Sequence, residues 1–315
     1  MTDPGELATA ARAIAPGDLG DVHGVAVIES APVLPVRRRR GLFRAALRMW
    51  RTRIGLLIVT LLVLTAIMGP WFAPHGQTEF VGTPNTREVD GLLFGTDKLG
   101  QDVWSRFLYG GRQLLGMAVL ATLIGLVVGV TIGLVAAYNR RRLDNVLMRS
   151  VDIMFAFPGL LIALAAVTTL GRKAWVIVLI VAITAIPRVA RVTRGSALGV
   201  VERDFVGAAE ALGESRTHIL AAEVLPNVAG PMLVEANLRL TYSIILIGTL
   251  GFLGFGPGLN EADWAQMINE NRLALSEQPW GTLLPALAIG LLTVGVGMIA
   301  DGLGRAVAGI DRGRT

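Results

Sequence analysis

The chain has 315 residues, of which 53% are hydrophobic and 17% are charged, and its mean hydropathy is +0.58. Soluble proteins carry about 25% charged residues, so this composition excludes an ordinary soluble chain. Cysteine is absent, which excludes disulfide scaffolds, cysteine-bound metals and thiol nucleophiles. We therefore expect an all-α integral membrane protein.

Six stretches of the chain are predicted to cross the membrane. A helix rises about 1.5 Å per residue and needs about 20 residues to cross roughly 30 Å of hydrocarbon. The shortest uncharged run, 174–187, reaches that length only if its helix continues past Arg188 and Arg191. The predicted spans are 54–73, 113–138, 153–171, 174–192, 236–256 and 280–300, with an external segment at 74–111.

The basic residues give the chain a pI near 10.3, and their distribution argues against nucleic-acid binding. Arginines cluster at 37–53 before the first span, at 140–142 after the second and at 305–314 after the last. Cytoplasmic loops retain basic residues, so both termini are expected in the cytoplasm. The high pI is therefore attributed to basic residues that set the membrane topology and contact anionic lipids.

Three parts are expected along the chain. Residues 1–36 are rich in Ala, Pro, Gly and Asp without helical periodicity, which indicates a disordered cytoplasmic tail. Residues 37–53 alternate arginines with apolar side chains, which is typical of an amphipathic elbow helix on the inner leaflet or of a plain basic flank. The six-span domain occupies 54–315.

The external segment contains a polar run at 94–106. Asp102 is expected to cap a short helix that carries Trp104 and Phe107 toward the membrane interface. Because polar residues have no reason to lie in lipid, this run is expected to shape an outer mouth.

Glycine recurs every four residues in the second span, at Gly125, Gly129 and Gly133. These glycines leave a smooth stripe on one helix face, which another helix can approach closely. The spacing therefore predicts a tight helix–helix contact.

No catalytic constellation is found in the sequence. Neither lysine, Lys98 or Lys173, stands in the Gly-Lys-Ser/Thr sequence that a phosphate-binding loop requires. The histidines, His23, His75 and His218, lack metal-ligand spacing. We expect a chain that is not an enzyme and that binds no metal or cofactor itself.

Ionisable residues inside a membrane are often functional. Glu235 and Arg239 lie four residues apart at the start of the fifth span, and we expect an intrahelical ion pair at the membrane surface. Asp152 is expected to pair with Arg149 or to favour a helix N-terminus. No chain of carboxylates crosses the predicted spans, which disfavours proton-coupled transport.

The segment 200–230 is expected to hold two short cytoplasmic helices. The first, about 203–212, ends at Gly213 in a left-handed C-cap, and Ser215 caps the second, which Pro226 stops. A short helix with a bare face can seat in another protein's groove, although an ordinary surface loop would show the same pattern. The bare face consists of Gly207, Ala208 and Ala211.

This segment resembles the EAA loop of the membrane subunits of ABC importers. The shared motif is Gly207-Ala208-Ala209-x-x-x-Gly213, followed by Leu225-Pro226. The external run is similar to a signature of the peptide/nickel permease family, in particular of its dipeptide and oligopeptide "C"-type subunits, and reads Gly95-Thr96-Asp97-x-Leu99-Gly100-x-Asp102-x-x-Ser105-Arg106. Further matches, which extend the resemblance over about 55–310, are Arg149-x-x-Asp152 before Phe157-Pro158, and Gly254-x-Gly256.

The chain departs from the family pattern at three places. Gly207 replaces the glutamate of the motif, an acidic residue appearing at Glu210 instead. Glu223 occupies a position that is usually hydrophobic, and Gln101 stands where the family has an arginine. The departures put in doubt a salt bridge from the first motif residue, but leave the helix–glycine–helix geometry intact.

The resemblance implies a six-span permease of the type I ABC importer kind, with a cytoplasmic coupling helix, forming half of a heterodimeric pore in a bacterial inner membrane. The implied partners are a homologous second permease, two ATP-binding cassette ATPase domains that bind ATP and Mg, an extracellular substrate-binding protein and membrane lipids. Short peptides are the expected cargo, with nickel chelates, glutathione or oligosaccharides as alternatives. A secondary transporter and a non-transporting scaffold remain open as functions of a different class.

The resemblance also implies roles for particular residues. Contact with the ATPases is expected for Asp204, Gly207, Ala208, Ala209, Ala211, Gly213, Leu225 and Pro226. Contact with the binding protein, or a place at the outer mouth, is expected for Asp97, Asp102, Trp104 and Arg106. Closure of the ATPases on ATP would push on the helix at 203–213 and tilt the spans.

Overall fold

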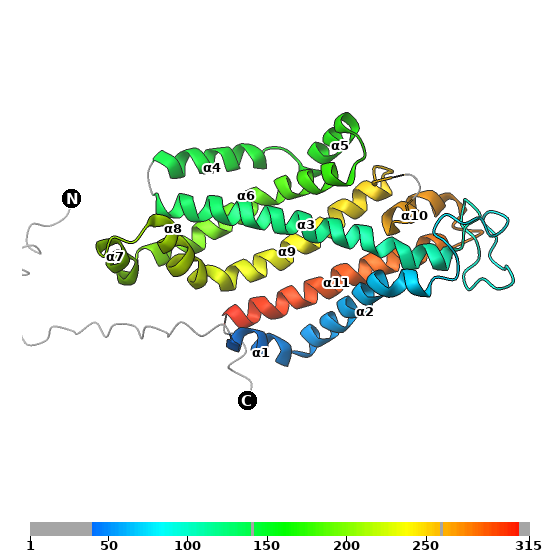
Figure 1. The fold of residues 1–315 in the computed structure, drawn as a ribbon, viewed down its shortest axis with the longest axis horizontal. Helices are drawn as coiled ribbons and strands as arrows, with labels where there is room; N and C mark the ends of the chain where they lie inside the picture. The colour runs from blue at the N-terminus through cyan, green and yellow to red at the C-terminus, as the bar shows by residue number, and fades with distance from the viewer. Residues whose placement is uncertain (1–39, 140–141, 259–260, 309–315) are drawn as a thin grey trace, which may run out of the picture. The chain divides into compact units, whose positions relative to one another are not determined.

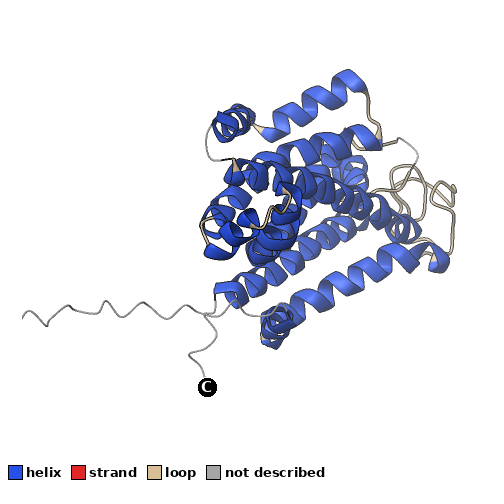
Figure 2. Ribbon diagram, turned by 60° about the vertical axis from the view of Figure 1, so that its left-hand side comes forward, coloured by secondary structure: helices blue, strands red, loops and turns tan. Residues whose placement is uncertain are grey.

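The computed structural model describes residues 40–139, 142–258 and 261–308. Within these ranges every regular element is a helix (Figures 1 and 2), as the composition predicts. Five helices are long and apolar enough to cross a membrane, or six if the bent pair α4–α5 is counted as one span. The tail predicted at 1–36 lies outside the described residues.

The helices follow one another with short connections, except for the external segment between α2 and α3. In chain order they are α1 (Arg40–Arg48), α2 (Trp50–Phe72), α3 (Val103–Tyr138), α4 (Arg142–Phe155), α5 (Gly159–Leu170), α6 (Ala174–Val201), α7 (Asp204–Ala211), α8 (Arg216–His218), the π-helical turn η1 (Ile219–Val224), α9 (Leu225–Phe252), α10 (Trp264–Asn271), the 3-10 turn η2 (Arg272–Ala274) and α11 (Trp280–Ala308).

α3 and α6 run side by side through the middle of the bundle and make its most extensive helix–helix contact (Figure 1). The glycine stripe of α3 faces α6. A Cβ atom placed on Gly129 would lie 2.6 Å from the Cβ of Val189, and one on Gly125 would lie 2.9 Å from the Cβ of Ala185. Real side chains do not approach this closely, so only glycine permits the contact, as the four-residue spacing predicts.

The remaining spans pack around this pair. α11 lies between α2 and α9, and α9 contacts both α3 and α6. Leu114, Ile177 and Ile244 form part of one buried apolar core. The outward faces carry exposed apolar side chains, such as Leu57 and Val127. A bundle that is apolar on its outer surface fits a lipid environment.

The third predicted span, 153–171, is wrong as a single helix. α4 ends at Phe155 and α5 begins at Gly159, and the two helix axes differ by 79°. Pro158 explains the break because its ring fixes φ, removes a backbone donor and disfavours helical geometry in the preceding residue. α4 lies along α6, where Arg194 donates two hydrogen bonds to Asp144 at 2.6 and 2.7 Å.

The other five spans are longer than predicted, and α11 continues to Ala308 rather than 300. α3 begins at Val103 rather than 113, α6 continues to Val201 and α9 begins at Leu225. A helix of 36 residues, the length of α3, extends about 54 Å, well beyond roughly 30 Å of hydrocarbon. The extra turns carry the external segment at one end and α7 at the other.

The glycine stripe generates a direct test. Gly129→Ala is expected to lower the free energy of unfolding by about 1–3 kcal/mol because the added methyl group overpacks the contact with α6. Gly116→Ala is the matched control, since Gly116 lies on the same helix and a Cβ there meets no atom within 4 Å. Thermal unfolding of the purified variants in detergent measures both. Equal stability of the two variants would contradict the close packing.

Candidate functional site

α7 lies at one end of the bundle with one face packed and the other bare. Val206 and Ala209 are buried in an apolar cluster that includes Leu134 of α3 and Ala197 of α6. The opposite face is exposed and carries Gly207, Ala208 and Ala211. A Cβ atom added at Gly207 would meet nothing within 4 Å. The helix is therefore packed on one side, against η1 and the apolar cluster, while its small-residue face is exposed.

Gly213 ends α7 in the left-handed conformation, with φ of +78°. The backbone N–H of Glu214 donates to the carbonyl of Ala209 at 3.1 Å, and that of Gly213 donates to Glu210 at 3.0 Å. This pair of bonds is the Schellman motif, which satisfies the last carbonyls of the helix. The predicted C-cap is confirmed, and so is Ser215 as the next N-cap, since its hydroxyl accepts a bond from the N–H of His218.

Pro226 does not stop the second helix, contrary to the prediction. The chain passes from α8 through the π-helical turn η1 into α9, and Pro226 stands in the first turn of α9. In η1 the N–H of Leu225 donates to the carbonyl of Leu220, five residues back. This wider turn shifts the hydrogen-bond register just before the proline, whose missing donor is tolerated in a first turn. α8, η1 and α9 therefore follow one another without a break, and residues 212–215 separate them from α7.

The external segment is held by a buried ion cluster. The guanidinium of Arg106, on α3, contacts the carboxylate of Asp97 and donates a hydrogen bond to Glu270, on α10, at 2.9 Å. Asp97 also accepts bonds from the backbone N–H groups of Leu99 and Gln101 at 2.8 and 2.9 Å. Because Asp97 and Arg106 are only 0% and 2% exposed, their charges are compensated by each other rather than by water.

Amide side chains extend this cluster to residues near the start of α11. The Asn271 side chain accepts a bond from the backbone N–H of Lys98 at 2.9 Å. Gln278, just before α11, donates to the carbonyl of Phe94 at 2.7 Å. The external segment is thereby tied to residues more than 170 positions later in the sequence.

Asp102 caps a helix, as predicted, but this helix is the 36-residue α3 rather than a short one. Its carboxylate accepts bonds from the N–H groups of Trp104 and Ser105. Phe107 stacks on Trp264 with ring centroids 5.4 Å apart, and the Trp264 indole N–H donates to the carbonyl of Phe107 at 2.8 Å. The aromatic side chains thus join α3 to α10, inside the protein.

Asp263 caps α10 in the same buried layer. Its carboxylate accepts bonds from the N–H groups of Ala265 and Gln266 at 2.9 and 3.2 Å. Burial raises the pKa of Asp263 to about 6, against the lowering effect of these two bonds.

Asp97, Asp102 and Arg106, for which the resemblance implies a place at the outer mouth or contact with a binding protein, are enclosed by this chain's own residues. All three are at most 2% exposed and make hydrogen bonds within the chain, so they hold the external segment in place. Trp104 is partly buried against Phe94 and Phe107. The sequence analysis did not identify Glu270, which pairs with Arg106 although it is remote from it in the sequence.

The ionisable residues of the spans also differ from expectation. Glu235 and Arg239 do form an ion pair, with 2.9 Å between Oε1 and Nε, but both side chains are buried between helices rather than at a surface. Asp152 pairs with Arg191 of α6 at 2.6 Å instead of with Arg149. Contacts with other helices determine both the burial of the first pair and the partner of Asp152. The spacing of residues along one helix cannot show such contacts.

Residues 129–309 match the family described as "Binding-protein-dependent transport system inner membrane component". That is more than half of the chain. The chain belongs to this family. It is therefore a multi-pass membrane permease component of ABC importers, as the two motifs predicted.

Curated relatives support the same assignment. The chain is 34% identical to a putative peptide transport system permease protein of Brucella suis biovar 1, over 88% of this chain and 91% of that protein. It is 34% identical to the dipeptide transport system permease protein DppC of Alkalihalophilus pseudofirmus, over 79% and 83%. It is 36% identical to the glutathione transport system permease protein GsiD of Escherichia coli, over 78% and 82%.

A solved structure shows the same fold. An inward-facing form of the MetNI methionine ABC transporter matches with a TM-score of 0.50 and 16% identity, over 66% of this chain and 97% of that chain. The helical arrangement is thus that of a type I importer, and the likeness shows the fold alone.

The buried ion cluster predicts a large effect on stability. Arg106→Gln is expected to lower the free energy of unfolding by about 3–5 kcal/mol because buried carboxylates lose their counter-charge. Replacing the whole cluster, Asp97→Asn with Arg106→Gln and Glu270→Gln, is expected to recover most of that loss. Arg87→Gln, at an exposed external arginine, is the control. Thermal unfolding in detergent reports all three, and an Arg106→Gln variant as stable as the control would contradict the cluster.

Proposed function

We propose that this permease forms half of the pore through which short peptides enter the cell, and that ATPase subunits drive it through the exposed face of α7. A second, homologous permease would complete the pore, two ATP-binding cassette domains would supply the energy, and an extracellular binding protein would deliver the peptide. ATP and Mg would be bound by the ATPase subunits.

The names of the relatives support short peptides as the transported cargo. Two of them are named as peptide or dipeptide permeases and the third as a glutathione permease, and glutathione is itself a short peptide. None of these three relatives is named for nickel chelates or oligosaccharides. Transport by a secondary mechanism or a purely scaffolding role fits the family poorly, since its description is that of a transport system component.

The distribution of arginines supports one orientation of the chain in the membrane. α1, α7 and the end of α11 lie at one end of the bundle, and the external segment lies at the other (Figure 1). The arginines of α1 and Arg305 of α11 belong to the first end. Since basic residues are retained in the cytoplasm, we place this end, and with it both termini and α7, on the cytoplasmic side of the inner membrane.

The single observation that carries the coupling role is the two-sided character of α7. Val206 and Ala209 belong to one buried cluster with residues of α3, α6 and η1, and only two residues, Glu202 and Arg203, separate α6 from α7. A push on the open face would therefore move α6 and α3 with it. ATP-driven movement of the ATPases could in this way switch the pore between inward-open and outward-open states.

Two substitutions test this role. Ala208 is exposed, so tryptophan there has room in the isolated chain but would overpack a close contact with an ATPase, weakening it by about 1–3 kcal/mol. Gly213→Val places a β-branched residue at φ of +78° and strains the cap by about 1 kcal/mol or more. Both variants are expected to insert normally, to retain less ATPase on purification and to lose uptake and substrate-stimulated ATP hydrolysis together.

Ala308→Trp is the matched control, since Ala308 is also exposed, at the end of α11. It is expected to retain the ATPases. Full ATPase binding and normal uptake in both test variants would show that α7 is not the site of energy input.

A further inference from the structure

An ion pair is buried halfway along the spans, and the proposed coupling through α7 gives it no role. Glu235 and Arg239 of α9 are 5% and 7% exposed. Arg239 lies level with Ala185 of α6, near the middle of the predicted span 174–192, and Ser243, one turn further, bonds to Thr122 of α3 at 3.0 Å. The pair is therefore distant from both ends of the bundle.

The two charges compensate each other but are poorly hydrogen-bonded. Glu235 Oε1 and Arg239 Nε are 2.9 Å apart, yet neither atom has an aligned hydrogen-bond partner among the described residues. Burying such a pair is expensive, and apolar residues of similar volume would be no less stable. Stability alone does not account for the pair, and ionisable residues at this depth point to a role in transport.

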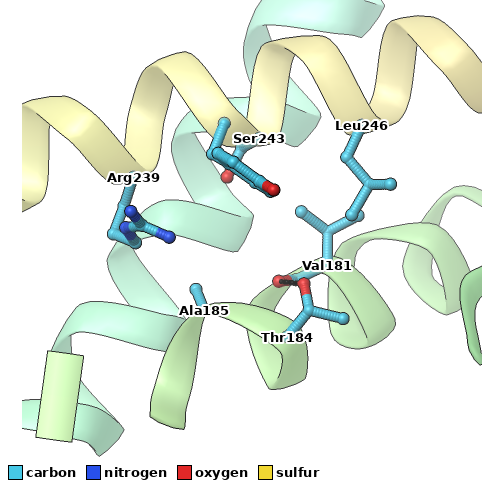
Figure 3. Close-up of a pocket in the computed structure, with 7 residues that line it drawn as sticks. Val181, Thr184, Ala185, Arg239, Ser243 and Leu246 are labelled. Atoms are coloured by element: carbon cyan, nitrogen blue, oxygen red, sulfur yellow. Dashed lines mark hydrogen bonds between the residues drawn. The ribbon is translucent and has the colours of Figure 1, made fainter. Parts of the chain in front are cut away.

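Arg239 borders a small pocket between α6 and α9. Figure 3 shows its guanidinium reaching into the space above Ala185. The guanidinium carbon also lies 5.2 Å from the centre of the Tyr242 ring, and Tyr242 is 60% exposed. The pocket has a volume of about 10 Å³, room for about one water-sized group such as a single carboxylate oxygen. Its lining consists of Val181, Thr184, Ala185, Arg239, Tyr242, Ser243 and Leu246.

We propose that Arg239 binds the C-terminal carboxylate of the transported peptide, and that Glu235 compensates the guanidinium charge between substrates. The inference rests on the proposed peptide cargo. A guanidinium matches a carboxylate in charge and in fork geometry. The carboxylate is also the narrow, anionic end of a peptide, the part that fits a pocket of this size. The rest of the peptide would lie along the exposed face marked by Tyr242.

The test uses the complete transporter, with its second permease, ATPases and binding protein, in proteoliposomes. ATP-driven uptake is measured for dialanine and for dialanine amide, which lacks the carboxylate charge, each at a concentration that saturates the binding protein. The main variant is Glu235→Gln with Arg239→Gln, which removes both charges and leaves none buried without compensation. Arg188→Gln, at an exposed arginine of α6 close enough to act on Arg239, is the matched control.

The double variant is expected to assemble with the ATPases and keep its basal ATP hydrolysis, while uptake of dialanine falls about tenfold or more, the value of one charge-assisted hydrogen bond. Uptake of dialanine amide is expected to stay within about twofold of the unsubstituted transporter. Should the double variant fail to assemble, Arg239→Lys, which keeps the charge but not the fork, is expected to narrow the preference for dialanine over its amide.

Unchanged dialanine uptake, or an equal fall for both compounds, would overturn the assignment of Arg239, the second result indicating a structural role. Failure of the unsubstituted transporter to take up dialanine would instead overturn the peptide cargo itself. Uptake of dialanine by the unsubstituted transporter therefore distinguishes a failure of the Arg239 assignment from a failure of the peptide cargo.

Discussion

The contact between α3 and α6 is the constraint on which the rest of the structure depends. Three glycines of α3 allow the backbones to approach so closely that Val189 and Ala185 fill the space where side chains would stand. At one end α3 begins beside the external segment, and at the other both helices share a buried apolar cluster with Val206 and Ala209 of α7. A close-packed pair transmits displacement because it has no free volume to absorb it.

This arrangement separates three tasks along one axis. The external segment is held by charged side chains that pair inside the protein, such as Arg106 with Glu270. The middle contains the Glu235–Arg239 pair beside a pocket. The end opposite the external segment presents the bare face of α7. Each task would use a different interaction, namely buried ion pairing, a charged group beside a small pocket and a steric fit, so a single substitution is expected to disturb one of them without the others.

Local patterns in the sequence predicted the features that depend on neighbouring residues. The glycine stripe, the Gly213 C-cap and the Asp102 N-cap each follow from a few consecutive residues and were found as expected. Features that depend on remote partners were not predictable in this way. The burial of Arg106 requires Glu270, which is 164 positions away, and Pro226 is accommodated by a π-helical turn that has no sequence signature of its own.

The most direct test of the account is a covalent one, since the chain contains no cysteine. Ala208→Cys in the assembled transporter would be labelled with a thiol-reactive benzophenone, illuminated and separated by mass. The account predicts an adduct between this chain and an ATPase subunit. Leu57→Cys, at a 59% exposed position on the apolar face of α2, is predicted to give none. A labelled, transport-competent Ala208→Cys variant that forms no ATPase adduct would contradict the claim that the importer is driven through α7.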